Sequence, residues 1–146
     1  MPLRENRQVR LVARPRGIPQ AEHFSLVTEP VAAVGKGEIL IQNRYLSVDP
    51  AQRGWANDEG NYSAPVPLNT PMRALAVGEI LESNAPEFRA GEFVYGWFGW
   101  QTHCVAAPDA VLPSAICIRC CAGYPKNRCT PKSFWASSWH KATHAS

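Results

Sequence analysis

Short runs of strand-forming residues, separated by glycine and proline turns, extend from residue 8 to about residue 111 of this 146-residue chain. The clearest run covers residues 38–48 (EILIQNRYLSV) and is rich in isoleucine, leucine, tyrosine and valine, which favour strands. The other runs that predict strands cover residues 8–13, 24–28, 73–81, 93–97 and 101–106. No apolar pattern before residue 112 is long enough for a helix of three turns. Together these runs indicate a mainly β domain, folded as a barrel or a sandwich.

The pattern stops at residue 112. Residues 112–146 show neither alternating nor helical apolar spacing, and they contain five basic residues and no acidic one. Residues 1–109 contain ten basic and twelve acidic residues, so the net charge of +3 comes from the end of the chain. We therefore predict a β domain over residues 1–111 and an irregular tail over residues 112–146. The tail is either disordered or the product of a lost reading frame.

Four of the five cysteines lie in this tail, where zinc binding is an alternative. Cys117 and Cys120 have a spacing seen in zinc sites, as have Cys121 and Cys129 in some zinc lobes. Adjacent cysteines, however, rarely both reach one tetrahedral ion. The basic residues and two tryptophans of the tail also permit a nucleic-acid site, but no known binding module accompanies them. We expect neither zinc nor nucleic acid to be a partner.

The sequence contains no signal for export or membrane insertion. No stretch of 18 apolar residues occurs, and the arginine-rich N-terminus has no apolar segment typical of a signal peptide. The sequence therefore predicts a cytoplasmic protein without a membrane partner.

Four stretches, in this order, resemble one protein family. They are NRQVRLVARPRGIP (6–19), GEILIQNRYLSVDPAQRGW (37–55), PMRALAVGEILES (71–83) and FRAGEFVYGWFGWQTHCV (88–105). Together they resemble the medium-chain dehydrogenase/reductase superfamily, in its zinc-independent, NADP-dependent branch of alkenal double-bond and prostaglandin reductases. The resemblance covers about residues 6–112 and implies a GroES-like, partly open β-barrel. In this family the barrel precedes a nucleotide-binding Rossmann domain.

The resemblance implies NADP(H) as the cofactor, but the sequence has no G-x-G-x-x-G motif. In that motif, glycines let the backbone approach the pyrophosphate at the start of a helix. We therefore expect the Rossmann domain to be absent from the chain, which would then bind NADPH weakly and be inactive alone. Zinc-dependent relatives have metal ligands at positions that correspond to Leu46, Ala74 and Leu75, whose side chains cannot bind a metal. The resemblance thus predicts no catalytic metal.

The loop after residue 48 corresponds to the edge of the substrate pocket in this family. The residues expected to line the pocket are Asp49, Ala51, Gln52, Arg53, Trp55, Met72 and Arg73. Ala51 replaces a tyrosine that many members have, so any contact made by that ring is missing. Tyr62 is the candidate hydroxyl donor to a developing enolate, although a tyrosine in a loop is more often an amphipathic anchor. The aromatic run at residues 97–100 is interpreted mainly as barrel packing, with Gln101 facing the cleft.

The sequence leaves two main functional hypotheses. The first is the N-terminal catalytic domain of an NADP(H)-dependent oxidoreductase that reduces the C=C bond of α,β-unsaturated carbonyls, or quinones, and forms a homodimer when intact. The second is a non-catalytic β-barrel module that binds a protein partner. The missing glycine motif favours an inactive chain under either hypothesis.

Overall fold

The computed structural model describes residues 4–58 and 63–113. The predictions made for the tail, including its irregular structure and the zinc and nucleic-acid alternatives, concern residues 114–146 and lie outside the described residues.

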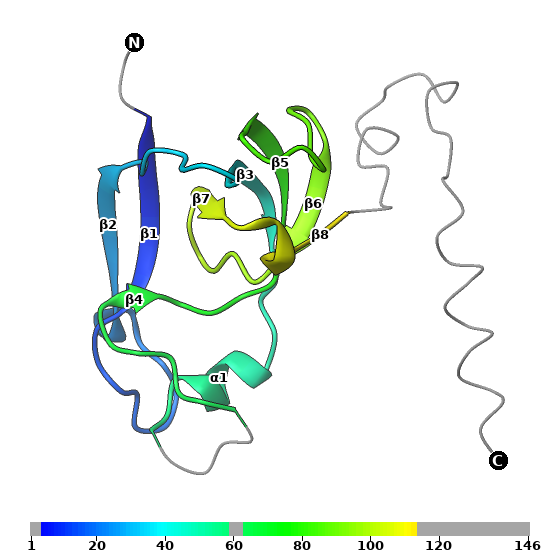
Figure 1. Cartoon of the computed structure of the whole chain (residues 1–146). Coiled ribbons are helices and arrows are strands. Elements are labelled where there is room, and N and C mark those ends of the chain that lie inside the picture. The colour runs from blue at the N-terminus through cyan, green and yellow to red at the C-terminus, as the bar shows by residue number, and fades with distance from the viewer. Residues whose placement is uncertain (1–3, 59–62, 114–146) are drawn as a thin grey trace, which may run out of the picture. The chain divides into compact units, whose positions relative to one another are not determined.

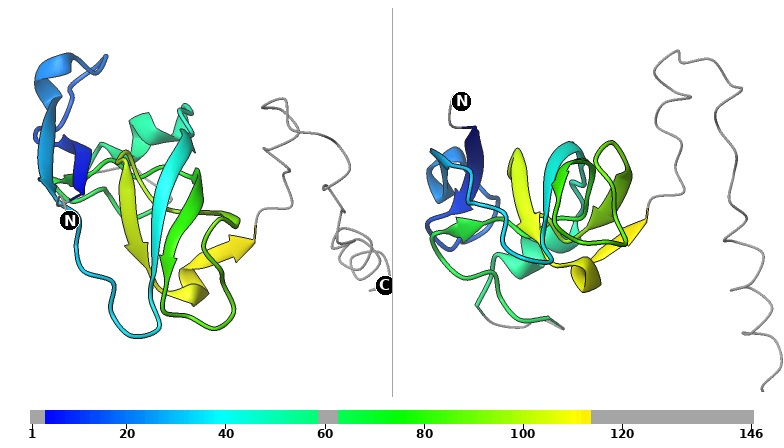
Figure 2. Two further views of the ribbon diagram at one scale, coloured as in Figure 1. Left: turned by 90° about the horizontal axis from the view of Figure 1, so that it is seen from above. Right: turned by 45° about the horizontal axis from the view of Figure 1, so that its top comes forward.

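Two antiparallel sheets make up the domain (Figure 1). The first sheet has the strand order β2-β1-β4, with bounds β1 Glu5–Leu11, β2 Phe24–Pro30 and β4 Thr70–Pro71. The second has the order β7-β3-β5-β6-β8, with bounds β3 Ile39–Leu46, β5 Ala76–Ser83, β6 Phe93–Gly96, β7 His103–Ala106 and β8 Val111–Pro113. Figure 2 shows the second sheet curling, with its long strands β3 and β5 side by side.

Three short helical segments connect the strands. They are the 3-10 turns η1 Ala21–His23 and η2 Pro108–Ala110 and the α-helix α1 Ala51–Trp55. Helix α1 follows β3 after the short link of residues 47–50, which contains the Asp49-Pro50 pair. It thereby carries the predicted pocket-edge loop.

The predicted mainly β class is confirmed, and each of the six predicted runs overlaps a strand. Helix α1 and strands β4 and β8 were not predicted, nor were the 3-10 turns η1 and η2. Helix α1 has only five residues, which is too short for a periodic apolar pattern. Strands β4 and β8 have two and three residues and each ends in a proline; both lie at a sheet edge, where a missing N–H is tolerated. Strand β8 also extends the folded domain two residues past the predicted boundary at residue 111.

Two hydrophobic clusters stabilise the two halves of the domain. One lies on the second sheet and is built on Ile39, Ile41, Ile80 and Val94, with Phe98 packed among them. The other lies under helix α1. Its buried members are Leu11, Trp55, Ala56, Val66 and Met72.

A connecting segment, residues 99–102, joins the two sheets. The N–H of Val9 in β1 donates to the carbonyl oxygen of Trp100 at 2.9 Å, and the N–H of Thr102 donates to Arg7 at 2.9 Å. On its other side, the carbonyl oxygen of Thr102 accepts a 2.9 Å hydrogen bond from the N–H of Asn43 in β3. The segment begins at Gly99, whose φ of 72° is costly for residues with a side chain. A Cβ added at this position would also lie only 3.1 Å from the carbonyl oxygen of Met72. It thus acts as a strand-like bridge that closes the sheets into a partly open barrel.

The packing of β3 against β5 predicts a large effect for Gly78→Ala. A Cβ at Gly78 would overlap Cγ2 of Ile41 and lie 2.8 Å from the backbone oxygen of Gln42, neither of which can move freely. We expect a loss of about 2–3 kcal/mol in the free energy of unfolding, measured by urea denaturation. The matched control is Gly35→Ala, whose Cβ would meet only the flexible carboxylate of Glu38, and it should cost less than about 1 kcal/mol. Equal losses in the two variants would contradict the strand packing described here.

Candidate functional site

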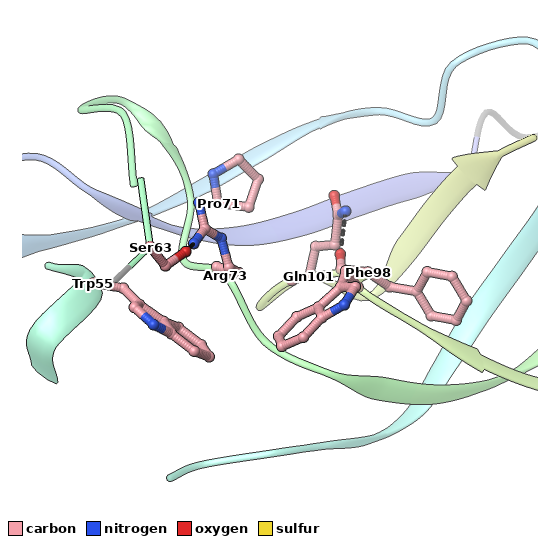
Figure 3. Close-up of a pocket in the computed structure, with 8 residues that line it drawn as sticks. Trp55, Ser63, Pro71, Arg73, Phe98 and Gln101 are labelled. Atoms are coloured by element: carbon pink, nitrogen blue, oxygen red, sulfur yellow. Dashed lines mark hydrogen bonds between the residues drawn. The ribbon is translucent and has the colours of Figure 1, made fainter. Parts of the chain in front are cut away.

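A pocket of about 720 Å³ lies between helix α1, strand β4 and the segment that leads into the connecting segment (Figure 3). This volume is in the range typical of small-molecule sites. The lining residues are Trp55, Ser63, Pro71, Arg73, Trp97, Phe98, Gly99 and Gln101. Most of its wall is therefore apolar and aromatic, with one cation, one hydroxyl and one amide.

Arg73 is the charged residue of this wall. Its Nη1 donates a 2.8 Å hydrogen bond to Oγ of Ser63, and its Cζ lies 5.5 Å from the ring centroid of Trp55, a cation–π distance (Figure 3). The two ion pairs found among the described residues join β1 to β2 and β3 to β5, and neither includes Arg73. Because a guanidinium has five N–H donors, this arrangement leaves donors available for a ligand oxygen.

Two indoles form the aromatic part of the wall. The ring centroids of Trp55 and Trp97 are 5.6 Å apart at an interplanar angle of 73°, an edge-to-face contact. Trp55 is buried, with 6% of its surface exposed, whereas Trp97 is 59% exposed. A large aromatic side chain that is both exposed and fixed by a buried neighbour provides a flat binding surface for a ring.

Gln52 holds this wall in place from behind. Its side chain is buried, and its Nε2 donates to the carbonyl oxygens of Ser47 and Arg73, each at 3.1 Å. Its Oε1 accepts a 3.2 Å hydrogen bond from the N–H of Asp49. The amide therefore ties the start of helix α1 both to the end of β3 and to the backbone of Arg73.

The structure separates the seven residues expected to line the pocket into two groups. Trp55 and Arg73 line it. The side chain of Asp49 accepts hydrogen bonds from Ala51 N–H and Ser47 Oγ in the turn before α1, while Ala51 and Met72 pack in the second hydrophobic cluster. Gln52 lies behind the wall, as described above.

Arg53 was expected to line the pocket, but its guanidinium forms three hydrogen bonds elsewhere. Its Nε donates to the carbonyl oxygen of Gly17 at 2.9 Å, its Nη2 to that of Pro15 at 3.2 Å, and its Nη1 to Oδ1 of Asn57. These contacts fix the turn after β1 against helix α1. Arg53 is not among the lining residues. Tyr62, the candidate hydroxyl donor, lies outside the described residues.

Sequence reasoning missed several lining residues of the 97–101 run, as well as Ser63 and Pro71. Phe98 is buried in the first cluster, as the packing interpretation expected, but Trp97 is largely exposed. Gln101 lines the pocket while its amide is engaged: Nε2 donates to the Phe98 carbonyl at 2.6 Å and Oε1 accepts from Asn6 at 2.9 Å.

The described part of the chain offers the pocket little acid–base or metal chemistry. Burial raises the pKa of the Cys104 thiol to about 11, so this thiol is protonated at neutral pH. Burial also lowers the pKa of His103, and neither residue lines the pocket. No three histidine, cysteine, aspartate or glutamate side chains within residues 4–58 and 63–113 lie together as a metal site. The described wall is therefore suited to binding and orienting a flat ligand and to donating hydrogen bonds to it.

Comparison with known sequences identifies the domain. The profile of a family described as the N-terminal domain of oxidoreductase matches residues 7–113. The chain belongs to this family. It is 39% identical over 107 residues to the NADPH-dependent curcumin reductase of Escherichia coli (strain K12), a match that covers 73% of the chain and 31% of that protein. It is also 28% identical over 111 residues to the NADP(+)-dependent 2-alkenal reductase of Nicotiana tabacum, over 73% of the chain and 32% of the relative.

Solved structures of CurA from Vibrio vulnificus share the fold. CurA superposes with a TM-score of 0.71 at 35% identity, and its complex with NADPH gives 0.69 at 36% identity. The matches cover 75% and 73% of the chain and 32% of each CurA chain. The predicted resemblance and the GroES-like fold are thus confirmed. The chain spans about a third of the length of the relatives it matches. No helix among the described residues is long and apolar enough to cross a membrane.

The position of Gln52 predicts that Gln52→Leu will damage the pocket as well as the stability of the domain. The substitution leaves the carbonyl oxygens of Ser47 and Arg73 without their amide donor. We expect a loss of about 2–3 kcal/mol in the free energy of unfolding, since unpaired buried polar groups are costly. We also expect altered indole N–H signals of Trp55 and Trp97 in NMR spectra.

The matched control for this prediction is Gln20→Leu. Gln20 is exposed, and its Nε2 donates a long hydrogen bond of 3.4 Å to the backbone oxygen of Ile18. This variant should lose less than about 1 kcal/mol and leave both indole signals in place. Unchanged stability and indole signals in Gln52→Leu would show that Gln52 does not hold the pocket wall.

Proposed function

We propose that this domain forms the substrate side of a reductase active site, which reduces the C=C bond of α,β-unsaturated carbonyls, or quinones, with NADP(H). The observation that carries the proposal is the pocket itself, in which the guanidinium of Arg73 lies beside two fixed indoles. Membership of an oxidoreductase N-terminal family supports it, as do relatives named for curcumin and 2-alkenal reduction.

The residues of the pocket fit a flat conjugated carbonyl compound. Indole faces favour planar apolar groups, and the remaining donors of Arg73 favour a carbonyl oxygen that gains negative charge. The described residues contain no strand, glycine turn and helix for a pyrophosphate, so most of the nucleotide would be held outside residues 4–113. When bound, NADPH supplies the hydride. CurA binds NADPH, which supports this cofactor for the intact protein.

The chain's own contribution to the reaction is positioning and charge stabilisation. Reduction of an enone places negative charge on the carbonyl oxygen, and a donor aimed at that oxygen stabilises the enolate more than the ketone. Arg73 and Ser63 are the wall residues that we assign to this role. Tyr62 remains a candidate hydroxyl donor, and Trp55 with Trp97 would orient the conjugated plane.

A second candidate function is a non-catalytic module that binds a protein partner. Three exposed apolar side chains favour it: Leu26, Leu46 and Val48 are 60%, 44% and 80% exposed, and they line a second pocket of about 420 Å³. A second domain of the same protein would cover such a surface equally well. Capture of a single folded partner in stoichiometric amounts, without NADPH oxidation by the chain or by a chimera that completes it, would favour the module. Homodimer formation and a cytoplasmic location remain predictions.

The reductase proposal predicts that joining this domain to a cofactor-binding domain will give reductase activity. The 146-residue chain alone should bind NADPH no more tightly than about millimolar and should not oxidise it with an enone. A chimera of residues 1–113 with the remaining part of the E. coli curcumin reductase should oxidise NADPH in the presence of curcumin or a simple enone. In that chimera, Arg73→Gln should lower kcat/KM by about tenfold to a hundredfold.

Arg89→Gln is the control, because it removes the same charge at an exposed position in the turn between β5 and β6. It should leave kcat/KM unchanged. Tyr62→Phe in the same chimera tests the hydroxyl donor separately. A chimera that unfolds cooperatively and binds NADPH, yet reduces neither enones nor quinones, would contradict the proposed function.

A further inference from the structure

We propose that this pocket selects flat aromatic substrates that carry a carboxylate, and that Arg73 is the residue that determines this preference. The inference rests on the proposed function, because it concerns the same pocket. It narrows the substrate class from enones in general to aromatic enones that also carry a carboxylate.

The aromatic preference follows from the shape of the apolar wall. Trp55 is fixed by burial and meets Trp97 edge to face, which leaves Trp97 held in place although more than half of its surface is exposed. Pro71 and Phe98 add to the apolar lining. A rigid ring gains more from such a surface than a flexible aliphatic chain, since it loses less conformational freedom on binding.

The preference for a negative charge follows from the way in which Arg73 is held. Ser63 binds one nitrogen of the guanidinium and the Trp55 ring lies against it, so the group is oriented before a ligand arrives (Figure 3). A serine hydroxyl and a ring do not neutralise the charge. Asp49, the acid just before α1, uses its carboxylate on Ala51 N–H and the Ser47 hydroxyl. The ion pairs among the described residues do not include Arg73. A carboxylate can accept two parallel hydrogen bonds from a guanidinium, the strongest pairing that a planar cation offers.

The aromatic surface and the guanidinium lie on one pocket wall, as Figure 3 shows for Trp55, Ser63 and Arg73. An aromatic enone with a carboxylate combines a ring for the indoles with an anion for Arg73, and cinnamate is a small probe with the same two groups. An anion beside a ring also occurs in a nucleotide, so the same chemistry could come from phosphate groups of the cofactor. The test must therefore separate a carboxylate ligand from a phosphate ligand.

The test is a binding titration of the full 146-residue chain, followed through the indole N–H signals of Trp55 and Trp97 by NMR. The two probes are trans-cinnamate and its neutral isostere cinnamamide. Because the chain has five tryptophans, the variants Trp55→Phe and Trp97→Phe assign the two signals. Cinnamate should bind about tenfold more tightly than cinnamamide, with shifts at both indoles, since a charge-assisted pair is about twice as strong as a neutral hydrogen bond. Arg73→Gln should remove this difference, Arg73→Lys should keep part of it, and Arg89→Gln should keep all of it.

Three further arms complete the test. Acetate should bind at least about tenfold more weakly than cinnamate if the ring contributes. Inorganic phosphate and NADPH should not displace cinnamate at equal concentration; displacement by either would assign Arg73 to the cofactor and overturn the proposal. Two further results would overturn the proposal. One is equal affinity for cinnamate and cinnamamide. The other is no binding of cinnamate at roughly 10 mM, near the weakest affinity that such a titration can measure.

Failure of this substrate preference can be distinguished from failure of the proposed function, because the titration requires neither cofactor nor turnover. A chimera that reduces neutral enones while the chain shows no preference for cinnamate refutes the substrate class alone. A clear preference for cinnamate in a chain whose chimera is inactive refutes the reductase function alone.

Discussion

The backbone hydrogen bonds of residues 99–102 are the interaction on which the pocket depends. This segment accepts from Val9 and donates to Arg7 on one side, and on the other it accepts from the N–H of Asn43. Its start is held as well, since Gly99 N–H donates to the Ala74 carbonyl at 3.0 Å and Trp100 N–H to the Met72 carbonyl at 2.9 Å. Through these bonds the two sheets become one partly open barrel, and Trp97 and Arg73 come to the same wall.

The side chain of Gln52 also holds the backbone that carries Arg73. The connecting segment fixes the carbonyls of Met72 and Ala74, and Gln52 fixes the carbonyl of Arg73 that lies between them. Three successive residues of the stretch between β4 and β5 are thus held from two directions. A rigid backbone at this point allows the guanidinium to be aimed into the pocket at a low entropic cost, which is what binding or catalysis by positioning requires.

Six of the eight strands in the described residues, and the fold class, could be predicted from the sequence, because strand patterns and turn residues act locally. Residues 39–46 form a strand whose first three residues are buried, as the apolar run from residue 38 predicted. The site was less predictable, since side-chain roles depend on contacts far apart in the sequence. Arg53 donates to Pro15 and Gly17, 38 and 36 residues away, and no local pattern around Arg53 indicates this. Trp97 was interpreted as packing because an aromatic run after a strand does not reveal which ring faces outward.

The most direct test of this architecture is native-state amide hydrogen exchange of the full chain, comparing the connecting segment with the β3–β5 core. The N–H groups of Val9, Asn43, Trp100 and Thr102 are all donors in the bonds that close the barrel. We expect them to exchange as slowly as the N–H of Ile80, to within about tenfold, because opening the segment requires the core to open as well. Rapid exchange at Trp100 and Thr102 beside a protected Ile80 would show that the sheets are not joined in solution, and that the pocket is not formed before a ligand binds.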